Sequence, residues 1–248
     1  MRNIKSNKIV IKVGTSTLTK CGGELNIGYI EKLVATICEL RDMGKQVVLV
    51  TSGAIAVGVK RLGLPQRPTD ISQKQSCAAV GQCLLMAVYD RFFRNHNQVI
   101  GQVLITKDCI DNEKKHVNAI NAFSALLNMG VIPIVNENDT VAIDEIVVGD
   151  NDTLAAYVAN MIDADLLILL TDVDGFYDEN GKIFSEITET TPEIKSLAKG
   201  GNGAGGMTTK LIAAEISNAK TIIMNGEKPN QIHDAIKGGQ IGTYFNIN

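Results

Sequence analysis

The glycine-rich segment that leads into a predicted helix near residue 207 is the part of the chain best suited to bind an anion. Five glycines fall between Gly200 and Gly206, and the sequence continues as Met207-Thr208-Thr209-Lys210. A glycine loop before a helix exposes backbone N–H groups at the positive end of the helix dipole, where phosphate binds readily. Lys210, one turn into the helix, can reach the same anion. The alternative is a flexible linker between two helices.

A second cation, Lys12, ends the apolar run of residues 8–13. A cation among apolar side chains is costly unless an anion pairs with it, although a lysine at a strand end can also extend its ammonium group into water. If Lys12 and Lys210 reach one site, they can stabilise a phosphoryl group during transfer, and Asp150 could hold both ammonium groups in place.

No residue offers itself as a catalytic base. The three histidines, His96, His116 and His233, are scattered through predicted helices without partners at ligand spacing. A hydroxyl acceptor would need a base to remove its proton, whereas a carboxylate, with a reference pKa of about 4.3, is already ionised at neutral pH. The sequence therefore favours phosphoryl transfer to a carboxylate, with lysines, backbone N–H groups and a bound Mg²⁺ offsetting the charge repulsion.

Small polar segments follow most of the apolar runs. They are residues 14–16, 51–53, 136–140, 149–152 and 171–175. Each can be turn chemistry alone, because Gly, Asn, Asp and Ser favour turns. In open α/β sheets, however, ligands bind beyond the carboxyl ends of the strands, so five such segments at one sheet edge indicate a binding site.

The elements that must position these residues alternate along the chain. Strands are predicted at residues 8–13, 46–51, 98–105, 131–135, 166–170 and 221–224, with a further strand-like segment at 145–148. Helices are predicted at 27–43, 72–94, 113–128, 151–161, 207–219 and 229–236. The strands are near-continuous hydrophobic runs, which is typical of parallel strands covered on both faces. The pattern predicts an α/β sandwich with a mostly parallel sheet, and a small excursion at 172–199.

Composition narrows the class of protein and its location. The 248 residues carry 24 Lys+Arg against 27 Asp+Glu, which excludes a dedicated nucleic-acid binder. Five cysteines without a C-x-x-C pair, and no apolar signal segment at the start, predict a reducing, cytoplasmic location. The longest uncharged stretch, 117–136, contains several asparagines and a Gly-x-x-Pro, so we expect a helix, a turn and a strand there, and no membrane segment.

Six blocks in order carry a resemblance to a known family. They are residues 11–16, 50–55, 135–139, 148–152, 170–172 and 205–210. Together they resemble the glutamate-phosphorylating members of the amino acid kinase family over nearly the whole chain. The resemblance implies a three-layer α/β/α sandwich and ATP-dependent phosphorylation of the γ-carboxylate of L-glutamate to L-glutamyl 5-phosphate, the first step of proline biosynthesis, with Mg²⁺ accompanying ATP.

The resemblance also implies a role for each matched residue. Lys12 and Lys210 would stabilise the transferring phosphoryl group, and Asp150 would organise them. Ser52, Asp139 and Asn151 would bind glutamate. The residues implied for ATP are Lys12, Thr171, Asp172, Ala204, Gly205, Gly206, Met207, Thr208, Thr209 and Lys210. Relatives usually carry Thr at position 204, so one hydroxyl contact near the nucleotide is missing here.

The resemblance further implies a single domain over residues 1–248. Residues up to about 164 would form an amino-acid lobe and residues from about 165 a nucleotide lobe, without the C-terminal PUA domain that many relatives carry. Homo-oligomers and feedback inhibition by proline are expected on the same basis, whereas nucleic-acid and membrane partners are not.

Three alternatives remain open. The acceptor could be that of an acetylglutamate, carbamate or uridylate kinase, although Asp139 suits a free ammonium group better than an acetylated one. The chain could be a non-catalytic sensor, which would have no transition state for two lysines to neutralise. The third alternative is an NAD-dependent dehydrogenase, because Gly201, Gly203 and Gly206 match the dinucleotide-binding pattern G-x-G-x-x-G, but the polar segment before them does not predict a strand.

Overall fold

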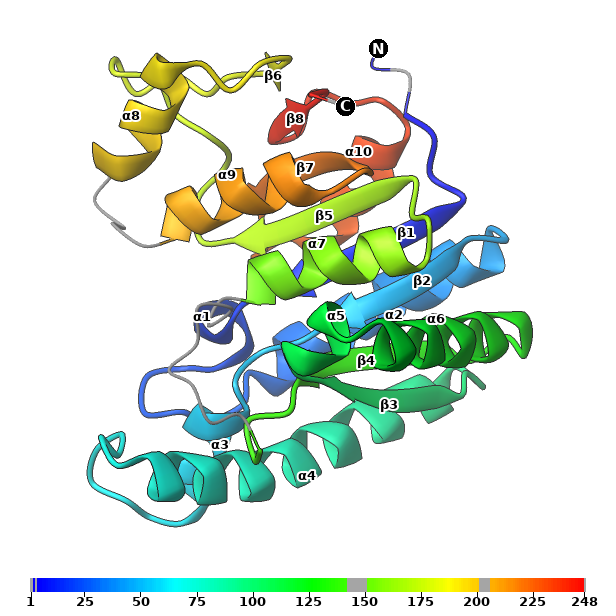
Figure 1. Ribbon diagram of the computed structural model, residues 1–248, viewed down its shortest axis with the longest axis vertical. Helices are drawn as coiled ribbons and strands as arrows, with labels where there is room; N and C mark the ends of the chain where they lie inside the picture. Colours follow the sequence, from blue (N-terminus) through cyan, green and yellow to red (C-terminus); the bar gives the residue numbers. More distant parts are fainter. Residues whose placement is uncertain (1, 3, 142–150, 201–205, 248) are drawn as a thin grey trace.

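One mostly parallel β-sheet forms the centre of the structure. The computed structural model describes residues 2, 4–141, 151–200 and 206–247. The strands in these residues are β1 (Lys8–Val13), β2 (Gln46–Val50), β3 (Ile100–Ile105), β4 (Ile132–Glu137), β5 (Leu166–Thr171), β6 (Glu186–Ile187), β7 (Lys220–Asn225) and β8 (Thr243–Phe245). They form one sheet in the order β3-β4-β2-β1-β5-β7-β8-β6 (Figure 1). Of the neighbouring pairs, β7 and β8 run antiparallel and the others run parallel.

Helices cover both faces of this sheet. One face carries α2 (Ile27–Asp42), α4 (Ile71–Asn95) and α10 (Ile232–Ile236), and the other carries α6 (Glu113–Asn128), α7 (Asn151–Met161) and α9 (Gly206–Ile216) (Figure 1). Ile9 and Ile11 of β1 pack into the first core, whereas Val10 packs into the second. Because successive strand residues point to opposite faces, a continuous apolar run fills both cores. The predicted α/β/α sandwich is confirmed.

Most predicted elements are present, and the differences lie at element ends and in short segments. The predicted helix at 207–219 ends at Ile216, where Asn160 on α7 accepts the N–H of Asn218. The predicted helix at 229–236 is a 3₁₀ turn, η1 (Pro229–Gln231), followed by α10. Sequence analysis missed the short helices α1 (Thr15–Leu18), α3 (Ala54–Arg61), α5 (Asp108–Asp111) and α8 (Pro192–Gly200), and the short strands β6 and β8.

Two other predicted segments can be compared with the structure. The excursion at 172–199 contains an antiparallel bridge between Tyr177 and Ile183, then β6 and α8. The uncharged stretch at 117–136 divides into α6, a turn at Gly130 and β4. In the described part of the chain, every helix is too short or too polar to span a bilayer. The strand-like segment at 145–148 lies outside the described residues.

Two glycines let α3 and α4 pack backbone against backbone. A Cβ atom on Gly81 of α4 would lie 1.8 Å from the carbonyl oxygen of Ala54, and one on Gly58 of α3 would lie 1.8 Å from that of Cys77. No side chain fits at such distances. This contact fixes the start of α3, which directly follows the end of β2, against the long helix α4.

We expect the Gly81→Ala variant to be destabilised by about 1–3 kcal/mol or more, because the added methyl group forces the two helices apart. The matched control is Gly28→Ala in α2, where a Cβ atom meets no described neighbour within 4 Å. That change should be neutral or slightly stabilising, because Ala favours a helix over Gly by about 1 kcal/mol. Denaturant unfolding measures both variants, and equal free energies of unfolding would contradict the packing role.

Candidate active site

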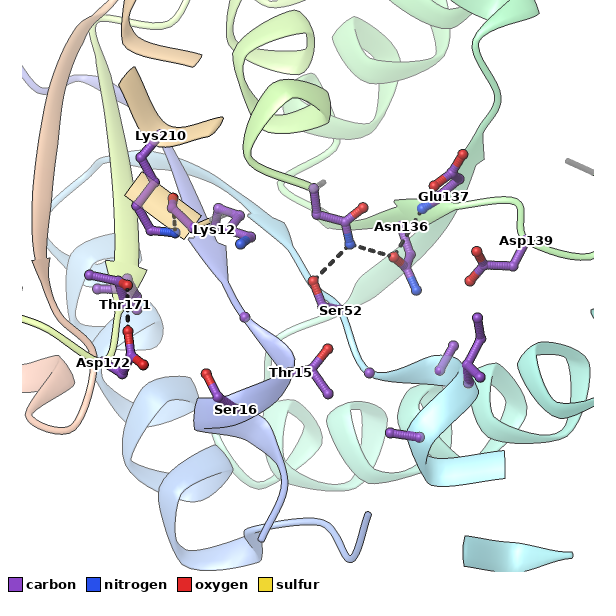
Figure 2. Close-up of a pocket in the computed structure, with 18 of the residues that line it drawn as sticks. Lys12, Thr15, Ser16, Ser52, Asn136, Glu137, Asp139, Thr171, Asp172 and Lys210 are labelled. Carbon is purple, nitrogen blue, oxygen red and sulfur yellow. Dashed lines mark hydrogen bonds between the residues drawn. The ribbon is translucent and has the colours of Figure 1, made fainter. Parts of the chain in front are cut away.

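A cavity of about 430 Å³ opens at the carboxyl edge of the sheet (Figure 2). Residues that follow β1, β2, β4 and β5 line it, together with the starts of α7 and α9. Of the residues that sequence analysis selected, those in the lining are Lys12, Ser52, Asp139, Asn151, Thr171, Asp172, Gly206 and Lys210. The parallel strands explain this gathering, because their carboxyl ends share one edge.

The buried carboxylate of Asp152 bridges the two lysines. Its Oδ1 lies 2.6 Å from Lys12 Nζ, and its Oδ2 lies 3.0 Å from Lys210 Nζ. The side chain of Asp152 is fully buried, and those of the lysines are 6% and 8% exposed. Lys210 Nζ also donates to the carbonyl oxygen of Gly206 at 3.0 Å. Opposite charge and the N-terminal dipole of α7 stabilise this buried group.

Asp152 was not assigned this role by sequence analysis. Asp150, which was, lies outside the described residues, so its role stays a prediction. The sequence offers a signal for Asp152 all the same, because it is an acidic residue in the first turn of a helix whose next residues, Leu154, Ala155 and Ala156, are buried. A carboxylate on the inner face of such a helix needs cationic partners.

Amide and hydroxyl groups form the wall of the cavity at the carboxyl ends of β2 and β4. Asn151 Nδ2 lies within hydrogen-bond distance of three acceptors: the carbonyl oxygen of Thr51 at 2.6 Å, Ser52 Oγ at 2.8 Å and Asn136 Oδ1 at 2.8 Å. Between Ser52 and α3 the chain turns at Gly53, whose φ of 95° favours glycine. This wall therefore joins three different segments of the chain through one amide.

An acidic corner lies opposite the lysines. Asp139 points into the cavity and Glu137 lies beside it (Figure 2). Burial raises the pKa of Glu137 to about 7, and the neighbouring Asp139 contributes to the rise. Burial also raises the pKa of Asp139, while the positive charge of Arg67 lowers it. A cationic group entering this corner would relieve the repulsion between the two carboxylates.

A second cavity of about 600 Å³ adjoins the first. The two share Thr171, Asp172, Gly206 and Lys210. The second cavity is more apolar, with Val173, Phe176, Tyr177, Leu197 and Met207 in its lining. Thr171 Oγ1 donates to Asp172 Oδ1 at 3.0 Å, at the junction of the two cavities. Lys210 can thus act on groups bound in either cavity.

Two described residues of the predicted ATP set lie away from both cavities. Thr208 and Thr209 line neither cavity. The hydroxyl of Thr208 donates to the carbonyl oxygen of Ala198, and that of Thr209 lies within hydrogen-bond distance of two acceptors, the carbonyl oxygen of Gly206 at 3.1 Å and Asp152 Oδ2 at 3.2 Å. Their hydroxyls therefore support α8 and the lysine bridge. Ala204 and Gly205 lie outside the described residues, so their contribution stays a prediction.

Sequence analysis missed several lining residues. Thr15 and Ser16 follow β1, and Asn136 and Glu137 end β4 just beyond the predicted strand at 131–135, but none was given a role. Their position just beyond a buried strand was the available signal. Arg67 belongs to the connection between α3 and α4, far from any predicted strand end, and no pattern in the sequence singles it out.

A buried pair of lysines on one carboxylate, at the edge of a parallel sheet and between two cavities, defines a phosphoryl-transfer enzyme of the α/β class. The chain belongs to the amino acid kinase family, whose sequence profile matches residues 7–225. This confirms the predicted resemblance.

Among the curated relatives are several glutamate 5-kinases. The one from Listeria welshimeri is 50% identical over 97% of this chain and 93% of its own length. The one from Clostridium perfringens is 48% identical, over 97% of this chain and 95% of its own length. A third, from a Thermoanaerobacter species, is 46% identical over 96% of this chain and 67% of its own length.

Replacing Asp152 by Asn should lower the free energy of unfolding by about 3–5 kcal/mol, because two buried ammonium groups lose their shared carboxylate. Asp172→Asn is the matched control, since Asp172 is an exposed carboxylate at the same sheet edge. It should change stability by no more than about 0.5 kcal/mol. Denaturant unfolding at neutral pH separates the two, and a similar loss in both variants would count against a special role of the bridge.

The raised pKa of Glu137 makes stability depend on pH. Between its unfolded value of 4.5 and about 7 the folded protein binds more protons at this site than the unfolded chain does. The Glu137 contribution to the free energy of unfolding therefore falls as pH rises through this window.

The Glu137→Gln variant should accordingly match the wild-type protein near pH 4.5 and be more stable at pH 8. The control is Glu31→Gln on the exposed side of α2, which should shift the melting temperature little at either pH. Thermal unfolding at the two pH values tests this prediction. A Glu137→Gln variant with the same pH dependence as the wild type would refute it.

Proposed function

We propose that the chain is a glutamate 5-kinase, which transfers the γ-phosphoryl group of ATP to the γ-carboxylate of L-glutamate and yields L-glutamyl 5-phosphate, the first step of proline biosynthesis. The observation that carries this proposal is the bridge from Lys12 to Lys210 through Asp152, set between a polar cavity and a more apolar one. The names of the relatives support the same reaction.

The distribution of charge in the polar cavity suits an amino acid with a carboxylate side chain. The lysines stand at one end, where the γ-carboxylate would meet ATP. Asp139 and Glu137 stand at the other end and would hold the α-ammonium group. The donors for the α-carboxylate would come from the wall that contains Ser52 and Asn151, and from Arg67 at the rim.

The reaction needs charge neutralisation more than it needs a base. An oxygen of the γ-carboxylate attacks the γ-phosphorus of ATP, the bond to the bridging oxygen of the β-phosphate breaks, and ADP leaves, so no proton has to be removed. Lys12 and Lys210 would offset the negative charge shared by acceptor, phosphoryl group and leaving group. Asp152 would keep the ammonium groups converged before substrates bind.

The more apolar cavity would hold the nucleoside of ATP, with the phosphates directed at Thr171, Asp172 and the start of α9. We therefore assign residues up to about 164 to an amino-acid lobe and residues from about 165 to a nucleotide lobe. Homo-oligomeric assembly and inhibition by proline stay predictions from the family resemblance. All five cysteines are free thiols, which supports a cytoplasmic location.

Magnesium fits this site as a companion of ATP. In the described residues no three His, Cys, Asp or Glu side chains gather around one point, but Mg²⁺ in kinases is held by one or two carboxylates, water and the substrate phosphates. Asp172, exposed at the junction of the cavities, is a carboxylate in the right place. The ion would supply positive charge to the phosphate oxygens.

The proposal is tested by ATP-dependent hydroxamate formation, which traps the acyl phosphate. We expect activity with L-glutamate that is lost when EDTA removes the metal. Lys210→Met should lower kcat by a factor of about 100 or more, with little change in KM for glutamate, because the lysine acts mainly in the transition state. The control Lys182→Met removes an exposed lysine and should leave kcat unchanged. Turnover with N-acetyl-L-glutamate in place of L-glutamate would overturn the proposal.

A further inference from the structure

The buried side chain of Gln82 reaches the amide wall of the polar cavity from behind. Gln82 lies on α4 directly after Gly81, where the contact with the start of α3 brings α4 closest to this wall. It is 8% exposed, and its Oε1 accepts a hydrogen bond from Asn136 Nδ2 at 2.9 Å. Gln82 does not line the cavity itself, so any effect on a ligand would pass through Asn136.

The hydrogen bonds of Asn136 leave only one kind of group for a ligand. Its Oδ1 accepts from Asn151 Nδ2 at 2.8 Å and from the backbone N–H of Glu137 at 2.9 Å, which uses both lone pairs. Its Nδ2 gives one hydrogen to Gln82 and keeps a second. Figure 2 shows Asn136 between Ser52 and Asp139. Asn136 can therefore offer the cavity a donor, which suits a carboxylate.

Gln82 is a poor choice for packing alone. Its Nε2 is buried and has no hydrogen-bond partner in the described part of the chain. A buried donor without a partner lowers stability, and an apolar side chain of similar length would avoid this loss. The acceptor oxygen of Gln82 is the feature that an apolar residue could not supply.

We propose that Gln82 is a positioning residue that fixes the Asn136 amide so that its free N–H points at a carboxylate of the amino-acid substrate. This inference rests on the proposed function, because it concerns the amino-acid half of the same cavity. Losing the Gln82 acceptor would let the Asn136 amide rotate toward other partners. The substrate would then bind less tightly, while the nucleotide cavity and the lysine bridge stay as they are.

The experiment compares Gln82→Met with the wild-type enzyme. Met has a similar volume but no acceptor oxygen. KM for L-glutamate should rise about 10- to 150-fold, the range that corresponds to losing one hydrogen bond to a charged group. KM for ATP should change less than twofold. The melting temperature should change little, because removing the unpaired Nε2 offsets the loss of the acceptor for Asn136 Nδ2.

Two further variants complete the test. Gln73→Met makes the same exchange at an exposed position of α4 and should leave both KM values unchanged. Gln82→Glu keeps an acceptor oxygen and should bring KM for glutamate closer to the wild-type value than Gln82→Met does. If Gln82→Met does not fold, Gln82→Leu replaces it.

The outcomes separate this inference from the proposed function. Wild-type turnover of glutamate with an unchanged KM in the apolar variants would overturn the positioning role and leave the kinase assignment intact. Equal rises in KM for glutamate and for ATP, together with a lower melting temperature, would make Gln82 a structural residue only and would also overturn it. Absence of glutamate turnover in the wild type would instead remove the proposed function.

Discussion

One buried carboxylate, Asp152, holds the structure of the candidate site together. Two ammonium groups that are 198 positions apart in the sequence, on Lys12 and Lys210, meet on its two oxygens. Burying these charges is unfavourable unless all three side chains are present and correctly placed. The end of β1 and the starts of α7 and α9 must therefore lie within a few ångströms of one another, and this requirement links the two halves of the chain.

The sheet satisfies that requirement because its central strands are parallel. β1 lies between β2 and β5, with Lys12 opposite Val50 on one side and Leu169 on the other. The chain leaves all three strands at the same edge, so the following turns converge there. Apolar packing on both faces makes this core rigid, and the polar residues at its edge inherit fixed positions. The close contact of α3 and α4 at their glycines likewise fixes the position of the wall that contains Ser52 and Asn136.

The sequence was sufficient to predict this framework, because β1, β5, α6 and α7 are marked by continuous apolar runs or by helical periodicity. The sequence was not sufficient for residues whose role depends on contacts between distant segments of the chain. The bridging role was predicted for Asp150, which lies outside the described residues, and the inward face of α7 marks Asp152 as a bridge in addition. Arg67 joins the cavity through the path of the α3–α4 connection. α3 itself went unpredicted because it is short and its central Gly58 serves a contact that only the fold creates.

The candidate site also contains several ionisable and polar groups whose burial is unfavourable for folding. Burial raises the pKa of Glu137, the buried Gln82 Nε2 has no hydrogen-bond partner among the described residues, and Lys12 and Lys210 are nearly inaccessible to water. The ammonium group of a zwitterion would add a favourable partner for Glu137, and a phosphate would add negative charge beside the two lysines. The two hydrophobic cores offset the unfavourable burial of these groups. Substrate binding should therefore stabilise the protein most at the acidic corner and at the two buried lysines.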